Sequence, residues 1–151
     1  MPVDPEFEEA RHGYSSDFET FRYESAESIV GSLRSFVRDA SPEQLRAWRD
    51  SVPDLQAEAS EIVVREGNGE TYTAVLEYEM PMEQRRADVV FLVGGAVVVL
   101  ELKGAGHATM AALDQASAYA RDLRNYHELC ADVPVYAVVV PTGAKGLKGR
   151  F

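Results

Sequence analysis

The sequence predicts an α/β protein with one central mixed sheet flanked by helices. Two runs rich in β-branched residues flank Gly94-Gly95, which is typical of a β-hairpin with a two-residue turn. A further apolar run at 134–140 follows a segment with helical spacing, which favours a strand in a parallel or mixed, central position. Amphipathic segments ahead of these strands indicate an extra N-terminal helical layer.

Length and composition indicate one domain in a reducing compartment. A chain of 151 residues buries about two-thirds of its unfolded surface as a single domain. No apolar run approaches the roughly 20 residues of a membrane span, and the acidic N-terminus lacks the apolar core of a signal peptide. Cys130 is the only cysteine, so no internal disulfide forms. We therefore expect a cytoplasmic protein without a membrane partner.

The N-terminal part reads as an arm followed by helices. Residues 1–20 are acidic and aperiodic, so we expect a flexible arm ahead of a domain at 21–143. Helical spacing of apolar residues predicts a helix at 25–39. Ser41-Pro42-Glu43-Gln44 is a capping box that begins a second helix. Pro53 starts or kinks a further helical stretch, which ends near Arg65.

The remaining elements are strands and one long helix. Alternation predicts a strand at 71–79, and the hairpin strands follow at 87–93 and 96–103. A helix from Thr109 to about His127 carries an alanine-rich packing stripe. The apolar strand at 134–140 completes the domain, and a basic tail spans 144–151.

Register arithmetic places charged residues together at one end of the hairpin. With a two-residue turn at Gly94-Gly95, strand positions pair when their numbers sum to 189, so Asp88 faces Glu101 and Arg86 faces Lys103. Opposed Cβ atoms are about 5 Å apart, so two carboxylates there repel unless a cation or a shared proton intervenes.

This cluster suits a hard divalent cation. Mg²⁺ or Mn²⁺ takes carboxylate and carbonyl oxygens, which Asp88, Glu101 and the backbone of Leu102 supply. Glu77 and Glu79 share a face of the preceding strand, and Glu79 is favoured as a further ligand because it lies nearer the strand end. Lys103 points to the same face as Glu101, where it suits a water or a phosphate; an ordinary strand-end ion pair is the alternative.

Gln115 and Tyr119 form an i, i+4 pair on one face of the following helix. Tyr119 alone reads equally well as a packing residue. Gln115, within an alanine-rich surface, is better suited to contact a water, the lysine or a phosphate.

Together these residues resemble a known family. Asp88, then Glu101-Leu102-Lys103, then Gln115-Ala-Ser-Ala-Tyr119 are similar to the PD-(D/E)XK nuclease superfamily, in particular its RecB-like branch with a Gln-x-x-x-Tyr helix motif. Over about 25–142 the chain also resembles the nuclease-like domain that precedes ATPase/helicase modules in uncharacterised bacterial proteins. The resemblance implies a restriction-endonuclease-like core of order α-β-β-β-α-β.

The resemblance also implies roles for individual residues. Asp88 and Glu101 are implied metal ligands, Lys103 the catalytic lysine, and Gln115 and Tyr119 accessory active-site residues. Glu27 is the candidate for a further acid from the first core helix. The chain departs from the pattern at Ala87, where the superfamily often has proline, and it contains no Walker A motif, so any ATPase module lies outside it.

The implied function is a Mg²⁺- or Mn²⁺-dependent endonuclease acting on DNA, in phage defence or DNA repair. The implied partners are DNA, a second copy of the chain and an ATPase or helicase module. The alternative is a catalytically inactive nuclease-like module that binds nucleic acid or a protein. The net charge of −10 and the missing proline favour that alternative.

Overall fold

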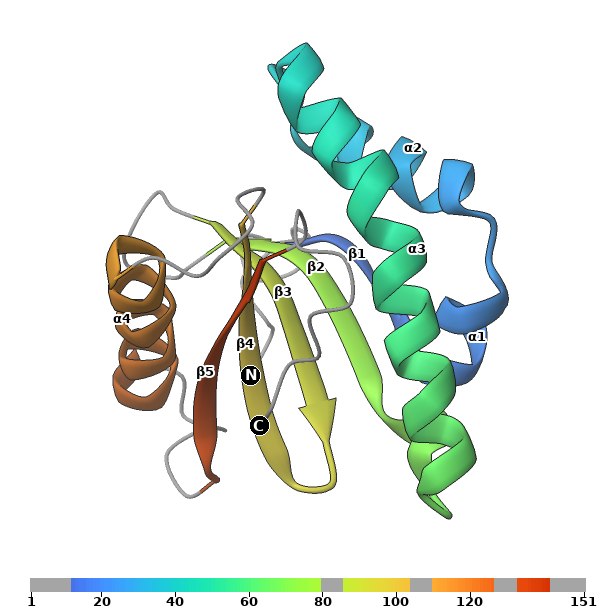
Figure 1. Cartoon of the computed structure of the whole chain (residues 1–151), viewed down its shortest axis with the longest axis vertical. Coiled ribbons are helices and arrows are strands. Elements are labelled where there is room, and N and C mark those ends of the chain that lie inside the picture. Colours follow the sequence, from blue (N-terminus) through green and yellow to red (C-terminus); the bar gives the residue numbers. More distant parts are fainter. Residues whose placement is uncertain (1–11, 80–85, 104–109, 127–132, 142–151) are drawn as a thin grey trace, which may run out of the picture.

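The computed structural model describes residues 12–79, 86–103, 110–126 and 133–141, which form an α/β fold around a five-stranded mixed open sheet. The helices at 18–23, 26–36 and 42–65 lie on one side of the sheet, and the helix at 110–126 lies on the other (Figure 1). In these four ranges, no helix combines the length and the apolar composition that crossing a membrane requires. The expected basic tail at 144–151 lies outside the described residues.

The sheet follows the chain in strand order β1-β2-β3-β4-β5. The first four strands pair antiparallel, and β5 pairs parallel with β4. Their bounds are β1 His12–Asp17, β2 Thr73–Glu79, β3 Arg86–Val93, β4 Ala96–Lys103 and β5 Val135–Pro141. Helix α4 (Met110–Tyr126) provides the crossover that a parallel β4–β5 pair requires.

The parallel pairing of β5 is confirmed, but its expected central position is wrong. β5 is the last strand in the order, so it forms one edge of the described sheet. Val135 is buried while Tyr136 is 55% exposed. Helix α4 covers β5 on one side. The apolar run of β5 therefore reflects burial against α4 and does not indicate a central position in the sheet.

The helices of the N-terminal layer begin where capping residues lie. Asp17, Ser25 and Ser41 each accept a hydrogen bond from a backbone N–H in the first turn that follows. The helices are α1 (Phe18–Tyr23), α2 (Ala26–Phe36) and α3 (Pro42–Arg65), and a 3₁₀ turn, η2 (Gly69–Thr71), precedes β2. Pro53 lies inside α3. The two expected helical stretches are therefore one helix of 24 residues.

The expected flexible arm over residues 1–20 is wrong from His12 onward; residues 1–11 lie outside the described part. Residues 12–17 form β1 and pair with β2, from His12 with Tyr78 to Asp17 with Thr73. The change from strand to helix at Phe18 explains why neither period is visible in so short a segment. Phe18 and Phe21 are fully buried, so this segment belongs to the core.

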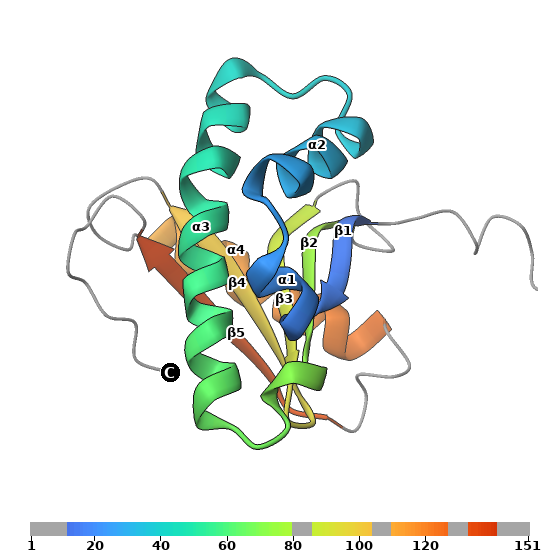
Figure 2. The same cartoon turned by 90° about the vertical axis from the view of Figure 1, so that its right-hand side faces the viewer.

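The sheet separates two hydrophobic clusters. Figure 2 shows α3 in front of the sheet and α4 behind it. On that side, residues of α1, α2 and α3 pack against alternate sheet residues that include Leu76, Val89 and Leu100. On the other side, Tyr119 and Ala120 of α4 pack against the intervening positions Val90 and Val99. Both faces of the hairpin are therefore covered, as its apolar composition predicts.

The turn between β3 and β4 has the predicted form. Gly94 and Gly95 have φ values of 53° and 81°, in the left-handed region that a type I′ turn needs at both central positions. Pairing runs from Val93 with Ala96 to Val89 with Leu100, which is the register summing to 189. This register carries Asp88 and Glu101 to the opposite end of the hairpin from the turn.

Candidate functional site

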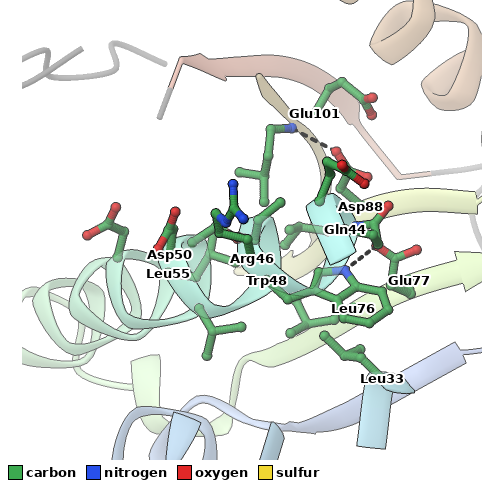
Figure 3. Close-up of a pocket in the computed structure, with 17 residues that line it drawn as sticks. Leu33, Gln44, Arg46, Trp48, Asp50, Leu55, Leu76, Glu77, Asp88 and Glu101 are labelled. Atoms are coloured by element: carbon green, nitrogen blue, oxygen red, sulfur yellow. Dashed lines mark hydrogen bonds between the residues drawn. The ribbon is translucent and has the colours of Figure 1, made fainter. Parts of the chain in front are cut away.

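Helix α3 and the ends of three strands enclose a cavity of about 650 Å³ (Figure 3). Its charged lining is mostly acidic: exposed residues of α3 supply the outer acids, and the strands supply the inner ones. Among the lining residues that the structure describes, Arg46 is the sole cation. The acids are Glu43, Asp50 and Asp54 from α3, Glu77 from β2, Asp88 from β3 and Glu101 from β4.

Glu77 reaches the cavity because its backbone departs from regular strand geometry. Its φ is +54°, the one positive φ among the described non-glycine residues. Leu76 faces the α3 side of the sheet. Glu77 also points toward α3, where its Oε1 accepts a hydrogen bond of 3.0 Å from Trp48 Nε1. Its Oε2 accepts one of 3.3 Å from Arg86 Nε. Burial raises the pKa of Glu77, and these two donors oppose that rise.

Asp88 is one of the three inner acids of the cavity. Its Oδ2 accepts a hydrogen bond of 2.9 Å from the backbone N–H of Leu102, drawn as a dashed line in Figure 3. Burial raises the pKa of Asp88 to about 7, and the charge of Glu77 adds to the rise. The Leu102 bond and the charge of Arg86 act in the opposite direction. The carboxylate of Glu77 therefore acts on Asp88, which the hairpin register alone did not indicate.

Glu101 is buried and connects the cavity to α4. Gln115 Nε2 donates to Glu101 Oε1 at 2.9 Å and to the Tyr119 hydroxyl at 3.0 Å. Tyr119 is itself buried, in the cluster beneath α4. The fold thus brings the Gln115–Tyr119 pair to an acid 14 positions earlier in the chain.

The other predicted site residues are placed differently. Glu79 pairs with Arg86 along β2 and β3 and does not line the cavity. Glu27 is exposed in the first turn of α2, also away from it. Lys103 ends β4, two residues after Glu101, but its side chain lies outside the described part of the structure. Leu102 contributes its N–H to Asp88, and its carbonyl stays a predicted ligand.

In a regular strand Glu77 and Glu79 lie on one face, so only the distance from the strand end distinguishes them as ligands, and Glu79 is nearer that end. A positive φ at a non-glycine residue has no local sequence signal. Trp48 is 4% exposed, as an ordinary core residue of its helix would be. Its hydrogen bond to Glu77 spans 29 positions, so no local pattern indicates it.

The donor set fits a cation such as Mg²⁺ that keeps several waters and uses one or two carboxylates. A bound cation would favour the charged forms of Asp88 and Glu77, whose pKa values burial raises. In the described ranges, no group of three or more His, Cys, Asp or Glu residues could hold a metal ion. The proposed protein ligands are Asp88, Glu101 and the Leu102 carbonyl. They would suit the ion only if water molecules complete its coordination shell.

No protein-family model matches the chain, and neither does any curated protein or solved structure. The fold and the cavity define an α/β protein with an acidic site at one end of a mixed sheet.

The raised pKa of Asp88 predicts that stability falls with pH when no metal is present. An aspartate titrates near 3.9 in an unfolded chain, and Asp88 titrates at about 7 in the fold. Below pH 4 Asp88 is protonated in both the folded and the unfolded state, so its contribution to stability is complete. That contribution is lost as the pH rises from 4 through 7. We expect a loss on the order of 3 kcal/mol between pH 4 and pH 8.

Urea unfolding in EDTA at several pH values measures this loss. Asp88→Asn should flatten the profile, whereas Asp54→Asn, at an exposed position lining the same cavity, should keep the wild-type slope. Parallel profiles for wild type and Asp88→Asn would contradict the prediction.

Proposed function

We propose that this protein is a divalent-metal-dependent nuclease that hydrolyses phosphodiester bonds in DNA. The observation that carries the proposal is the hydrogen bond from Gln115 to Glu101, which joins two separate sequence motifs at one site. The order α3-β2-β3-β4-α4-β5 supports a restriction-endonuclease-like core, in keeping with the resemblance to the PD-(D/E)XK superfamily. On this proposal β1, α1 and α2 are additions to that core, so α3 is the first core helix and Glu27, on α2, lies outside the core.

Two of the acids in the cavity are the proposed metal ligands. Asp88 and Glu101, with the carbonyl of Leu102, would hold Mg²⁺ or Mn²⁺ at the cavity. A bound ion supplies an activated water and offsets negative charge on the phosphate. The Leu102 N–H orients the Asp88 carboxylate, which restricts the directions from which its oxygens bind a ligand.

Gln115 orients the second acid in the same way. Its amide donates to one oxygen of Glu101 and also to the Tyr119 hydroxyl, so the buried tyrosine limits the movement of the amide. Lys103 lies on the same strand two residues beyond Glu101, and we propose that it holds the attacking water or stabilises charge on the phosphate.

A catalytically inactive nuclease-like module is the second candidate. The acidic wall along α3 and the net charge of −10 repel a polyanion, which favours a partner other than DNA. Calorimetry with Mn²⁺ separates the two functions. Binding that is lost in Glu101→Gln supports the nuclease, and no heat at millimolar metal supports the inactive module.

The test of the proposal is Mn²⁺-dependent cleavage of plasmid and single-stranded DNA by wild type, Gln115→Ala and Ser117→Ala. Removing a group that orients a metal ligand typically costs 10–100-fold, so Gln115→Ala should lower kcat/KM by about that factor. Ser117 is exposed on the same helix, so Ser117→Ala should cleave as wild type does. Wild type that leaves both substrates intact, or a Gln115→Ala variant as active as wild type, would count against the nuclease.

A further inference from the structure

Arg86 is held at one end and open to solvent at the other. Its Nε donates to Oε2 of Glu77, whose side chain is 7% exposed, whereas the arginine side chain is 40% exposed. The other carboxylate oxygen of Glu77 is occupied by Trp48 Nε1. Trp48, buried in the α3 side of the core, thus fixes the glutamate, and the glutamate fixes the arginine.

The outer end of this arginine has donors to spare. Arg86 carries five N–H donors in a planar fork, and the contact with Glu77 uses Nε. Within the described residues, the two terminal nitrogens form no hydrogen bond or ion pair. A lysine would balance the charge of Glu77 equally well, but an arginine fixed through Nε leaves a pair of donors that matches two phosphate oxygens.

Arg86 also lies beside the proposed reaction site. Arg86 and Asp88 are two residues apart on β3, so their side chains leave the strand on the same face. The arginine is near enough for its charge to act on Asp88. A polyanion that approaches this mostly acidic cavity needs cations near it. Arg46 is the cation within the described lining, and Arg86 lies two residues from Asp88 on β3.

We propose that Arg86 binds a phosphate group of the DNA substrate beside Asp88, and that Glu77 and Trp48 are positioning residues that hold its guanidinium there. The inference rests on the proposed nuclease function and names the residue that receives the substrate. The inference also accounts for the positive φ of Glu77, because this backbone conformation turns the carboxylate toward Arg86.

The test is binding of a fluorescent single-stranded oligonucleotide, measured by anisotropy over a range of salt concentrations, with Ca²⁺ in place of Mn²⁺. Arg86→Gln should raise Kd about tenfold and reduce the slope of log Kd against log salt by about 1, because one phosphate contact is lost. Arg86→Lys should keep that slope but recover only part of the affinity. Arg65→Gln, at an exposed arginine of α3 that does not line the cavity, should change Kd less than twofold.

Two further variants separate binding from folding. Arg86→Gln leaves Glu77 as a buried charge without its cation, so that variant can lose stability for a structural reason. The double variant Arg86→Gln/Glu77→Gln removes both charges and should show the same loss of salt slope with wild-type Tm. Glu77→Gln alone should keep the salt slope and raise Kd by about threefold. Arg86 keeps its charge in this variant, but the contact that positions its guanidinium is weaker.

Cleavage kinetics with Mn²⁺ distinguish this inference from the function on which it rests. A rise in KM with little change in kcat in the double variant supports a binding role for Arg86. A double variant that binds and cleaves as wild type does overturns the inference and leaves the nuclease intact. Wild type that neither binds nor cleaves DNA overturns both.

Discussion

Replacing Asp88 by asparagine should lower metal-dependent DNA cleavage on the order of 1000-fold, the largest effect on activity that we expect. The substitution keeps the size of the side chain and an oxygen that can accept from the Leu102 N–H. It removes the negative charge that a divalent cation needs. Single-turnover cleavage of a labelled DNA substrate in Mn²⁺ measures the chemical step directly.

The same variant should be at least as stable as wild type at pH 8 in EDTA, since the amide carries no charge to desolvate. Loss of activity without loss of stability therefore separates a role in chemistry from a role in folding. Asp114→Asn, at an exposed position on α4, is the matched control and should retain wild-type rates. Retention of more than a tenth of the activity by Asp88→Asn would remove this residue from the proposed site.

Replacing Phe18 by alanine should destabilise the fold by about 3–5 kcal/mol, the largest effect on stability that we expect. Phe18 is fully buried and lies edge-on to Phe91 and Tyr72, with ring centroids 4.9 and 5.8 Å away. Its loss leaves a cavity between α1 and the sheet that the surrounding aromatic rings cannot fill. Urea or thermal unfolding at pH 6 measures the change.

Tyr23 is the matched control for that experiment. It lies in the same short helix but is 71% exposed, so Tyr23→Ala should cost less than about 1 kcal/mol. Equal stabilities of Phe18→Ala and wild type would mean that Phe18 contributes nothing to the core, in keeping with the flexible arm expected over residues 1–20.

The hairpin was predictable because its determinants are local. Two glycines supply the positive φ values of a type I′ turn, and a two-residue turn leaves one register for the flanking strands. The helix starts at Ser25 and Ser41 were predictable for the same reason. Each capping side chain accepts a hydrogen bond from a backbone N–H only three residues later.

The first strand and the buried glutamate were not predictable, because their determinants lie far away in the chain. β1 pairs with residues about 60 positions later. Its neighbour β2 provides the hydrogen-bonding partners, which the short, aperiodic sequence of β1 did not indicate. Gly13 shows how close the packing is: a Cβ there would lie 2.7 Å from Leu33 Cδ2. The position of β5 at the edge follows likewise from the path of the chain through α4.

For the candidate site, local sequence was sufficient to place Asp88 and Glu101 at one end of a hairpin and Gln115 and Tyr119 on one helical face. Tertiary packing set the partners of each acid: Glu101 with Gln115, and Asp88 with Glu77 and Arg86. The physical reason is that turn and strand geometry act over a few residues. A buried carboxylate must instead find donors among whatever side chains the fold brings near, as Glu77 does with Trp48.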